Sequence, residues 1–544
     1  MKQLLGWLTL CIIGCTTSTA QTTLQLDSTV LEVSTLLDDL HVPWEILWGP
    51  DDWIWLTERN GRISRVDPET GTHQILHSLF DCYEYSESGL LGMVLHPNFN
   101  EFPHVFIVYN YYDDGNREKL VRYTYNDGSL TAPTTLLENI TASSGGNHSG
   151  SRLLILPDET LLMTVGDYYN SMIAQDLNAI NGKIIRLNLD GSVPADNPIP
   201  GSYLYSWGHR NAQGLVLAPN GLLYSSEHGP SNDDEFNIIE ANNNYGWPNV
   251  EGFCNTSSET NFCNNNNVIE PLAAWTPTLA VCGIDYYNHL AIPEWYGSVL
   301  MCNLKQPSFL QLRFNQEGTE IIEERNISTF DFGRLRDVCV APDGRVFIAT
   351  SNQDGRAPGW SDFPLPNDDR IIALKNAAYQ PVMPVATFDY NTECLTVQFD
   401  NTSVDADTYF WNFGNGYTSS LASPTQIYFE PGTYTVQLIA SNAYSSDTTS
   451  INLSLDCSNG ISPSDEPTYK LYPNPCNDFV QISFPQSLDG ASLQLIDIKG
   501  NVMYHTTLSE SLVYLFNTRQ FSTGIYYTKI THKNKTTVKK LVIN

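Results

Sequence analysis

The stretch Pro219-Asn220-Gly221-Leu222-Leu223-Tyr224 decides the fold of most of this 544-residue chain. Proline followed by asparagine initiates a tight turn, so the apolar strand that begins at Leu222 starts in a fixed register. A proline followed by an acidic or amide residue and then a strand recurs as Pro50-Asp51, Pro97-Asn98, Pro157-Asp158, Pro293-Glu294 and Pro342-Asp343. Six copies at intervals of roughly 50 to 75 residues predict six structural repeats.

The sequence around these phrases is typical of an all-β domain. Between about residues 30 and 376, short apolar or alternating runs are separated by Pro, Gly, Asn and Asp, and helical stretches are few. Such turns also occur in β-sandwiches, but radial repetition accommodates many short strands without long exposed edges. The sequence therefore predicts an all-β fold with a six-bladed β-propeller over residues 21–378.

A second β unit is predicted at residues 385–457, after a linker-like stretch from Tyr379 to Pro384. Two of its phrases resemble the signature of PKD domains, which are Ig-like β-sandwiches: Trp411-Asn412-Phe413-Gly414-Asn415-Gly416 and Pro431-Gly432-Thr433-Tyr434-Thr435-Val436. Asn412 and Asn415 stand where that signature has Asp, which removes charge but keeps the turn geometry. The resemblance implies a spacer or a weak contact with a glycan or protein.

Residues 468–544 form a third predicted unit, after a Ser/Pro/Asp-rich linker at residues 462–467. This unit opens with Tyr472-Pro473-Asn474-Pro475 and closes with Gly524-Ile525-Tyr526 and a lysine-rich strand. It resembles the C-terminal sorting domain of the type IX secretion system, which implies a small β-sandwich recognised by the secretion machinery. The lysines alone could equally protect the edge of a sheet.

The charge balance argues against nucleic-acid binding. Asp and Glu outnumber Lys and Arg by 60 to 28, which gives a formal net charge of −32 at pH 7. Such a field repels phosphate backbones. No segment beyond the N-terminus approaches ~18 consecutive apolar residues, so no transmembrane helix is predicted.

The N-terminus is typical of a secretory signal peptide over residues 1–20. Lys2 precedes a mostly apolar run, and Ala20 offers a cleavage site. An alternative treats Ile12-Ile13-Gly14-Cys15 as a lipobox with Cys15 lipidated. Together with the type IX resemblance, these features predict a secreted or surface-attached protein exported through the periplasm of a Gram-negative bacterium.

Nine cysteines follow Ala20, so at least one thiol must stay unpaired. In an oxidising compartment, the nearby Cys254 and Cys263 could close a disulfide around an Asn-rich loop. Cys394 and Cys457 could bracket the second unit. The spacing of these cysteines does not suit a zinc site.

Three phrases in the predicted propeller are rich in groups that do not build cores, namely Gly208-His209-Arg210-Asn211-Ala212-Gln213-Gly214, Glu227-His228-Gly229-Pro230-Ser231-Asn232-Asp233-Asp234-Glu235 and Asn244-Tyr245-Gly246-Trp247-Pro248. An arginine beside amides, with glycines that let the backbone approach a ligand, suits a polar planar anion. Taken singly, His209 could be a satisfied buried imidazole, and Asp233 to Glu235 a solvated loop.

Together and in order, these phrases resemble the soluble glucose and aldose dehydrogenases that depend on pyrroloquinoline quinone (PQQ). Further matches over ~340 residues are Pro43-Trp44-Glu45, Thr57-Glu58-Arg59-Asn60-Gly61-Arg62-Ile63, Gly89-Leu90-Leu91-Gly92, His96-Pro97 and Arg334-Leu335-Arg336-Asp337-Val338. The resemblance implies an enzyme with PQQ and Ca²⁺ as cofactors. It also implies a sugar substrate and an external electron acceptor.

The resemblance assigns a catalytic role to His148, in the phrase that runs from Asn147 to Leu153 before the strand that ends at Gly166-Asp167. A neutral imidazole can remove the hydroxyl proton of a sugar while hydride leaves the same carbon. Arg210 and Asn211 match residues that contact the carbonyl side of the quinone, where a fixed cation stabilises negative charge.

The same resemblance assigns cofactor contacts elsewhere. The backbone oxygens of Gly229 and Pro230 match calcium ligands, and hard oxygen ligands suit Ca²⁺. Lys305, Arg334 and Arg336 match contacts to cofactor carboxylates, and Thr278 matches a further polar contact. A lysine or arginine at these places could otherwise form a salt bridge between blades.

Three predicted pocket residues differ from the glucose-oxidising members of the family. Glu87 and His228 stand where those members have Gln, and Asn147 stands where they have Asp. The cofactor prediction survives these differences, whereas glucose specificity does not follow.

The sequence thus predicts a quinoprotein that oxidises the anomeric hydroxyl of an aldose or short oligosaccharide to a lactone by hydride transfer to PQQ. One alternative is a non-catalytic propeller that binds a glycan or protein at the cell surface. Another is a quinoprotein that acts on a non-sugar alcohol.

Overall fold

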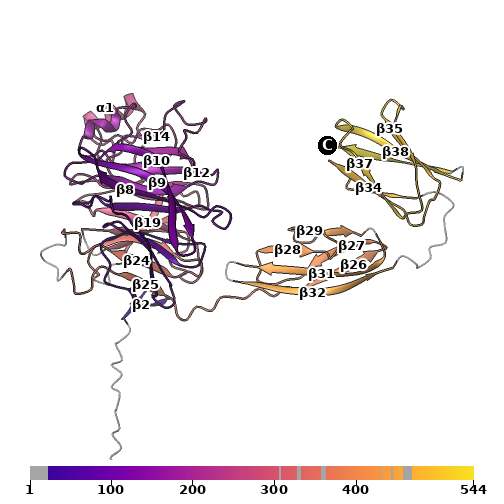
Figure 1. The fold of residues 1–544 in the computed structure, drawn as a ribbon, viewed down its shortest axis with the longest axis horizontal. Helices are drawn as coiled ribbons and strands as arrows, with labels where there is room; N and C mark the ends of the chain where they lie inside the picture. Colours follow the sequence, from indigo (N-terminus) through magenta and orange to yellow (C-terminus); the bar gives the residue numbers. More distant parts are fainter. Residues whose placement is uncertain are drawn as a thin grey trace, which may run out of the picture. The chain divides into compact units, whose positions relative to one another are not determined.

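The computed structural model of the chain describes residues 22–305, 308–327, 332–356, 363–428, 430–442, 445–456, 468–533 and 535–544. The chain divides after Gln380 into two compact units. The first contains a β-propeller, and the second contains two β-sandwiches (Figure 1). The predicted all-β fold is confirmed. The predicted signal peptide, including Cys15, lies outside the described residues.

Six sheets form the propeller. Blade 1 contains β3 (Pro43–Trp48), β4 (Ile54–Glu58), β5 (Arg62–Val66) and β6 (His73–Ser78). Blade 2 contains β7 (Leu90–Leu95), β8 (His104–Tyr112), β9 (Asn116–Asn126) and β10 (Ser129–Thr141). Blade 3 contains β11 (Gly150–Ile155), β12 (Thr160–Val165), β13 (Lys183–Asn188) and β14 (Leu204–Trp207).

The remaining blades follow the same plan. Blade 4 contains β15 (Ala212–Leu217), β16 (Leu223–Glu227), β17 (Asp234–Ile238) and β18 (Ala273–Trp275). Blade 5 contains β19 (Val281–Tyr287), β20 (Ser298–Asn303), β21 (Phe309–Phe314) and β22 (Ile321–Asn326). Blade 6 contains β23 (Leu335–Val340), β24 (Val346–Thr350) and β25 (Ile371–Lys375), extended by β2 (Val30–Leu37) and β1 (Thr22–Gln25).

The ring closes through its first and last strands. The first strand of each blade packs beside the first strand of the next, and β23 packs beside β3, which confirms the six-bladed prediction. In blade 6, β2 from the N-terminal end pairs antiparallel with β25. This pairing joins the two ends of the domain in one sheet, which removes two open edges.

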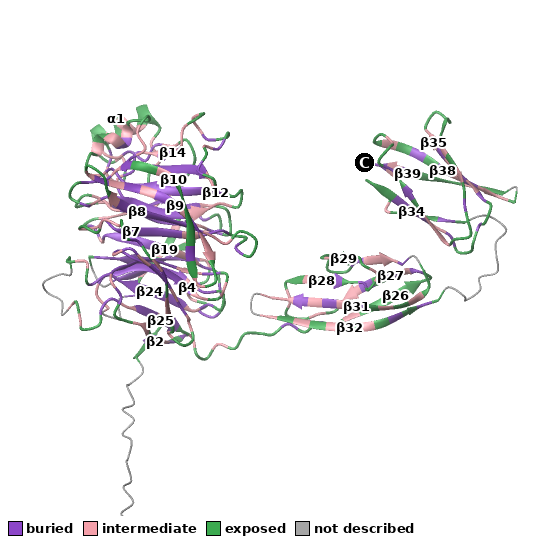
Figure 2. Cartoon of the chain, viewed as in Figure 1, coloured by how far each residue is buried: buried purple, intermediate pink, exposed green. Residues whose placement is uncertain are grey.

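All six proline phrases lie where one tight turn is needed. Each falls between the first and second strand of a blade, as Pro219 does between β15 and β16. Near-continuous apolar runs such as β12 are buried, as are most of the propeller strands drawn in Figure 2. The outermost strand β22 instead alternates between half-buried and exposed residues. Buried strands need apolar side chains on both faces, while half-exposed strands need them on one.

The antiparallel order of each blade sorts its loops onto two faces. The turns with the proline phrases lie on one face. The loops that precede each first strand, and those between each second and third strand, lie on the opposite face, which we call the entry face because the first strands begin there.

The first sandwich packs two sheets, β26-β27-β30 and β29-β28-β31-β32, around the buried Trp411. Asn412 and Asn415 act as the PKD resemblance implied, because their side chains accept hydrogen bonds from the backbone N–H groups of Gly414 and Tyr417 at 3.0 and 3.2 Å. Its strands are β26 (Phe388–Glu393), β27 (Thr396–Asn401), β28 (Thr408–Asn412), β29 (Thr418–Ser419), β30 (Thr425–Ile427), β31 (Gly432–Ser441) and β32 (Ser446–Leu455).

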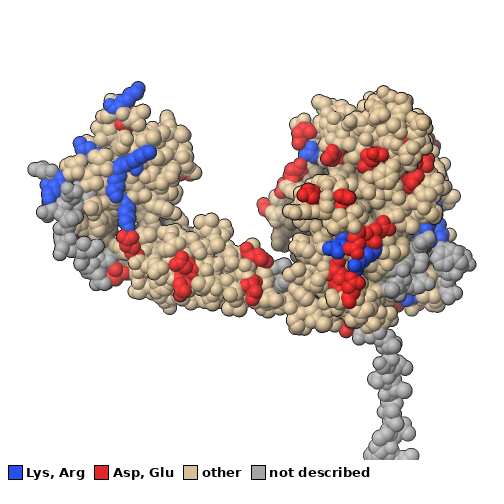
Figure 3. Space-filling view, turned by 180° about the vertical axis from the view of Figure 1, so that it is seen from behind, with Lys and Arg blue, Asp and Glu red and all other residues tan. Residues whose placement is uncertain are grey.

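The C-terminal sandwich packs β33-β34-β37 against β36-β35-β38-β39. On the face drawn in Figure 3, it displays mostly lysine and arginine, whereas acidic residues are spread over the propeller. The edge strand β39 carries three lysines, Lys535, Lys539 and Lys540. The strands are β33 (Lys470–Tyr472), β34 (Phe479–Ser483), β35 (Ser492–Asp497), β36 (Val502–Thr507), β37 (Val513–Asn517), β38 (Gly524–His532) and β39 (Lys535–Ile543).

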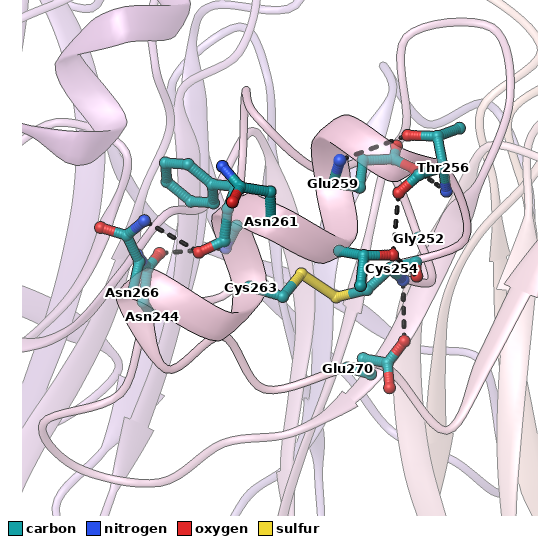
Figure 4. The surroundings of a disulfide bond; sticks show 12 residues. Asn244, Gly252, Cys254, Thr256, Glu259, Asn261, Cys263, Asn266 and Glu270 are labelled. Carbon is teal, nitrogen blue, oxygen red and sulfur yellow. Dashed lines mark hydrogen bonds between the residues drawn. A yellow bond between two sulfur atoms is a disulfide. The ribbon is translucent and has the colours of Figure 1, made fainter.

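The propeller carries one short 3₁₀ helix, η1 (Ser171–Gln175), and one α-helix, α1 (Ser257–Asn266), in its described residues. Helix α1 begins at a capping box formed by Thr256 and Glu259, and the disulfide between Cys254 and Cys263 ties it to the preceding loop (Figure 4). The Cys254–Cys263 prediction is confirmed. Within the described residues, no helix is long and apolar enough to cross a membrane.

The other cysteines divide into two groups. Cys457 lies outside the described residues, so its pairing with Cys394 stays a prediction. The free cysteines of the described residues are Cys82, Cys282, Cys302, Cys339 and Cys476.

Candidate active site

The predicted site residues converge on the entry face. Glu87, Asn147, His148, Arg210, Asn211, Thr278 and Arg334 lie in or end the loops before first strands, and Arg336 lies one residue into β23. His228, Gly229 and Pro230 lie between β16 and β17, and Lys305 between β20 and β21. They come from blades 2 to 6, so ring closure brings together residues that are far apart in sequence.

His148 and Asp167 form a buried pair within this group. His148 Nδ1 lies 2.7 Å from Asp167 Oδ1, and the two residues are 6% and 1% exposed. The other oxygen, Asp167 Oδ2, accepts a hydrogen bond from Trp247 Nε1 at 2.9 Å. A carboxylate at Nδ1 fixes the tautomer of the imidazole and leaves Nε2 as its basic nitrogen.

The backbone holds His148 in an uncommon conformation. Its φ is +59°, in the left-handed region, and its backbone N–H donates to Glu87 Oε2 at 3.2 Å. The ring stacks on Tyr169 at a centroid distance of 4.1 Å. A Cβ at Gly166 would come within 1.9 Å of the His148 carbonyl oxygen, so only glycine lets these two loops approach. Backbone strain of this kind is concentrated at functional sites.

Arg210 and Asn211 are positioned by Glu227 at the end of β16. The backbone N–H groups of both residues donate to Glu227 Oε1. Arg210 Nη1 donates to the His228 carbonyl at 3.0 Å, and its guanidinium lies 5.4 Å from the centroid of Trp247. His209 is 1% exposed and contacts Glu227 and Ser206, so it is the satisfied buried imidazole considered above.

A second cationic group lies at the start of blade 6. Arg334 donates to Asp354 Oδ2 and to the Leu304 carbonyl, both at 2.7 Å. Arg336 Nη1 donates to Gln213 Oε1 at 2.8 Å. Arg334 therefore pairs with a carboxylate of the protein at short distance, whereas the same carboxylate of Asp354 lies 4.0 Å from Arg336 Nη2.

Lys305 and Thr278 complete the cationic side of the site. Lys305 Nζ contacts Thr278 Oγ1, and Thr278 is 4% exposed. The backbone N–H of Lys305 also donates to the Leu279 carbonyl at 3.0 Å, which ties the β20–β21 loop to the loop before β19. The structure thus places the two predicted cofactor contacts beside each other.

Several buried nitrogens of this group have no partner in the described structure: Asn211 Nδ2, His228 Nε2 and Arg336 Nε. Burial, together with the positive charges of Arg210 and Arg336, lowers the pKa of His228 well below its usual value, so the ring stays neutral. Unpaired buried donors are costly and rare in native proteins. Their convergence fits a ligand that presents several acceptor oxygens.

The loop with Gly229 and Pro230 is held from beneath by Asp234. This aspartate is fully buried and accepts hydrogen bonds from the N–H groups of Gly229 and Ala280 at 2.8 and 2.5 Å. A Cβ at Gly229 would lie 1.9 Å from the Asn232 carbonyl oxygen. No cluster of three or more metal-ligating side chains occurs among the described residues, so a cation here would depend on backbone oxygens and on its ligand.

The predicted pocket residues Glu87 and Asn147, which precede blades 2 and 3, meet a residue of blade 6. Arg356, in the loop between β24 and β25, pairs with Glu87 and donates to Asn147 Oδ1. Ser86 Oγ also donates to Asn147 Oδ1, at 3.0 Å. Charged and amide groups therefore gather where the resemblance places the sugar.

A buried ion network lies on the first strands beneath the site. Arg152 of β11 contacts Glu45 of β3 and lies 3.2 Å from Asp337 of β23, and its guanidinium lies 4.5 Å from the ring of Trp44. Burial raises the pKa of Glu45, and the charge of Arg152 counteracts that rise. Removing the arginine would leave two buried carboxylates, a change that typically costs about 3–5 kcal/mol.

Four residues at the site were not predicted: Asp167, Trp247, Asp354 and Arg356. Asp167 and Trp247 lie in sequence motifs that already contain or adjoin candidate site residues. An acidic residue followed by two tyrosines close to a candidate base could have indicated Asp167 from the sequence. Asp354 and Arg356 lie in an irregular loop with no motif. Only the fold places them beside the other residues.

Sequence profiles of three families match successive parts of the chain. The profile described as Glucose / Sorbosone dehydrogenase matches residues 40–358. The PKD domain profile matches residues 378–456, and that of the secretion system C-terminal sorting domain matches residues 470–544. All three resemblances drawn from the sequence are confirmed.

Curated proteins and solved structures agree with the first profile. Quinoprotein glucose dehydrogenase B of Acinetobacter calcoaceticus is 36% identical over 59% of this chain and 85% of its own length. An aldose sugar dehydrogenase of Escherichia coli is 30% identical over 60% and 91%. The PQQ-bound aldose sugar dehydrogenase of Streptomyces coelicolor superposes with a TM-score of 0.55 and 31% identity over 63% of this chain and 98% of that one.

Proposed function

The chain belongs to the glucose/sorbosone dehydrogenase family and is a sugar dehydrogenase with a C-terminal secretion domain. From that premise, we propose that it oxidises the anomeric hydroxyl of an aldose or oligosaccharide to a lactone, with PQQ as hydride acceptor. The observation that carries the proposal is the buried His148–Asp167 pair beside a cationic wall with unpaired donors.

His148 is the proposed base. Its Nδ1 is engaged by Asp167 at 2.7 Å, so Nε2 takes the proton of the sugar hydroxyl as hydride leaves the same carbon. Asp167 then stabilises the imidazolium. Because Asp167 is only 1% exposed, water competes little for this interaction.

The residues present fit a tricarboxylated quinone. When bound, PQQ accepts the hydride while Ca²⁺ acts on it as a Lewis acid. Arg210 and Asn211 would face its carbonyl side, and Asn211 Nδ2 is one of the unpaired donors. The backbone oxygens of Gly229 and Pro230 would hold Ca²⁺. Lys305, Thr278, Arg334 and Arg336 would bind the carboxylates.

The pocket rim would select the sugar. Glu87 and Asn147 offer acceptor oxygens to sugar hydroxyls, and neutral His228 can accept or donate a single hydrogen bond. These groups fix hydroxyl orientation without demanding a charged substrate, because Glu87 is already paired with Arg356.

Reconstitution tests the proposal. The purified chain is titrated with PQQ in Ca²⁺ and assayed for dye reduction with a panel of aldoses, and the product is identified by NMR. We expect turnover and an aldonolactone or its hydrolysis product. A fully loaded protein that oxidises no aldose but oxidises simple alcohols would contradict the assignment of sugar as substrate.

The sorting domain indicates secretion. We propose that the type IX machinery recognises it after transfer across the periplasm of a Gram-negative cell. Secretion by a type IX host of the full chain, compared with a chain lacking residues 468–544, tests this proposal. Equal amounts of both proteins in the medium would contradict it.

A further inference from the structure

Three tyrosines form a cluster on the entry face of blade 2. The ring centroid of Tyr83 lies 6.1 Å from that of Tyr85, with an interplanar angle of 30°, and 5.3 Å from that of Tyr112. Tyr85 and Tyr112 are 52% and 65% exposed, and Tyr83 is half-buried. We call these three residues the tyrosine cluster.

The tyrosine cluster is continuous with the proposed sugar pocket. Tyr83 and Tyr85 belong to the loop that precedes β7, and this loop continues directly into the pocket residue Glu87. A Cβ at Gly146 would come within 2.1 Å of the Tyr85 carbonyl oxygen, so the loop packs tightly against the segment that leads to His148. The backbone N–H of Glu87 donates to the Gly146 carbonyl at 2.9 Å.

The chemistry of the tyrosine cluster suits sugar rings. Tyrosine presents a flat apolar face together with a hydroxyl that can donate and accept, and both match a pyranose, which has an apolar face and an equatorial rim of hydroxyls. The two centroid distances are comparable with the spacing of successive rings in a glycan. Exposed aromatic side chains gathered beside a pocket indicate a binding surface.

The charges around the tyrosine cluster favour a neutral ligand. Asp81 pairs with Lys119 at 2.7 Å, and Glu84 pairs with Arg59 at 3.2 Å. These pairs neutralise Lys119 and Arg59, so neither cation is left to attract an acidic polymer. Carboxylates and amides at the rim can instead accept hydrogen bonds from hydroxyl groups.

We propose that the tyrosine cluster binds the second and following units of a neutral oligosaccharide whose reducing-end unit occupies the pocket at His148. The inference rests on the proposed function and deepens it, because it makes an oligosaccharide rather than a free monosaccharide the preferred substrate. Oxidation takes place at the anomeric carbon of the reducing end. The remaining sugar units are therefore linked through another hydroxyl of the reducing-end unit, and they extend away from His148 toward Tyr85.

Kinetics with matched substrates test the proposal. The full chain, loaded with PQQ and Ca²⁺, is assayed with glucose, maltotetraose and cellotetraose, which cover α- and β-linked chains. We expect a higher kcat/KM for at least one tetrasaccharide than for glucose. Tyr85→Ala and Tyr112→Ala should each lower that value about five- to tenfold, mainly through KM, while glucose is unaffected.

The chain offers a matched control. Tyr296 is 51% exposed but lies in the turn between β19 and β20, on the face opposite the entry face. Tyr296→Ala should leave the kcat/KM of all three sugars unchanged. Melting temperatures of the three variants establish that each one is folded.

A binding measurement separates this proposal from the proposed function. Calorimetric titration of the full chain without quinone should show tighter binding of the preferred tetrasaccharide than of glucose, and Tyr85→Ala should remove the difference. Wild-type binding that is equal for glucose and both tetrasaccharides would overturn the tyrosine cluster as a sugar site, as would tyrosine variants with unchanged binding. Oxidation of glucose alone by the loaded enzyme would still support the proposed function.

Discussion

Replacing Asp167 by asparagine tests the chemistry assigned to His148. One carboxylate oxygen of Asp167 accepts from His148 Nδ1 at 2.7 Å and from the Tyr169 N–H at 3.0 Å, and the other accepts from Trp247 Nε1 at 2.9 Å. Asparagine has nearly the same shape, but one of its two ends is a donor. It therefore cannot accept from His148 and Trp247 at the same time, and it carries no charge to stabilise an imidazolium.

The size of the effect follows from that single interaction. A hydrogen bond to a charged group contributes about 1.5–3 kcal/mol. This interaction gains strength only when His148 becomes charged, so its loss should lower kcat by about 10- to 150-fold. KM should change little, because Asp167 is buried behind His148 and acts through it, so ground-state binding of the sugar should be retained.

The assay compares kcat and KM for dye reduction, together with the affinity for PQQ in Ca²⁺. Asp113→Asn, at an exposed position in the β8–β9 turn, removes the same charge from the entry face and should behave like the wild type. PQQ affinity should be unchanged in both variants. A folded, quinone-loaded Asp167→Asn protein with wild-type kcat would refute the assignment of His148 and Asp167 as base and orienting carboxylate.

Other predictions address the remaining parts of the site and the fold. His148→Ala should keep quinone binding and lower kcat by about 10²- to 10⁴-fold, and His148→Gln should be almost as impaired; recovery of activity by Gln would instead indicate a structural histidine. Chelation of Ca²⁺ should weaken PQQ binding measured by titration, and equal affinity with and without chelator would exclude this cation site. Gly229→Ala should weaken PQQ binding in the presence of Ca²⁺, because the added Cβ would meet the Asn232 carbonyl oxygen. A chain that ends at Gln380 should fold and oxidise sugar when produced in another host, because the propeller is one compact unit. A truncated chain that folds and binds quinone but is inactive would contradict this domain boundary. Burial raises the pKa of Glu118 to about 8, so the protonated carboxyl contributes stability that is fully present below the unfolded-state pKa and is lost as pH rises toward 8. Between pH 5 and pH 8, the melting temperature of Glu118→Gln should therefore fall less than that of the wild type, and parallel curves of melting temperature against pH would disprove the raised pKa.

Local chemistry explains why much of the fold was predictable. A proline followed by Asp or Asn makes a turn wherever it stands, because both residues act on their own backbone. All six phrases accordingly lie in equivalent turns of the blades. The asparagines at positions 412 and 415 likewise cap turns of the first sandwich through contacts that span two residues.

The sequence by itself also determined which residue types gather at the site. Arg210, Asn211 and His228 lie in phrases too polar for a core, and each is found on the entry face. The family resemblance assigned their roles, and those roles stay proposals. His148 was recognised in the same way, as a member of a motif rather than from its surroundings.

Only the tertiary structure decided which of these groups meet. Asp167 lies 19 residues from His148, at the open end of the β11–β12 hairpin in which Gly150 pairs with Val165, whereas Arg356 lies 269 residues from Glu87. The hairpin brings the first pair together, and ring closure brings the second together, because β2 pairs with β25 and every first strand then begins on one face. The physical reason is that turns and hairpins depend on residues close in sequence, whereas contacts between blades depend on how all six sheets pack around a common axis.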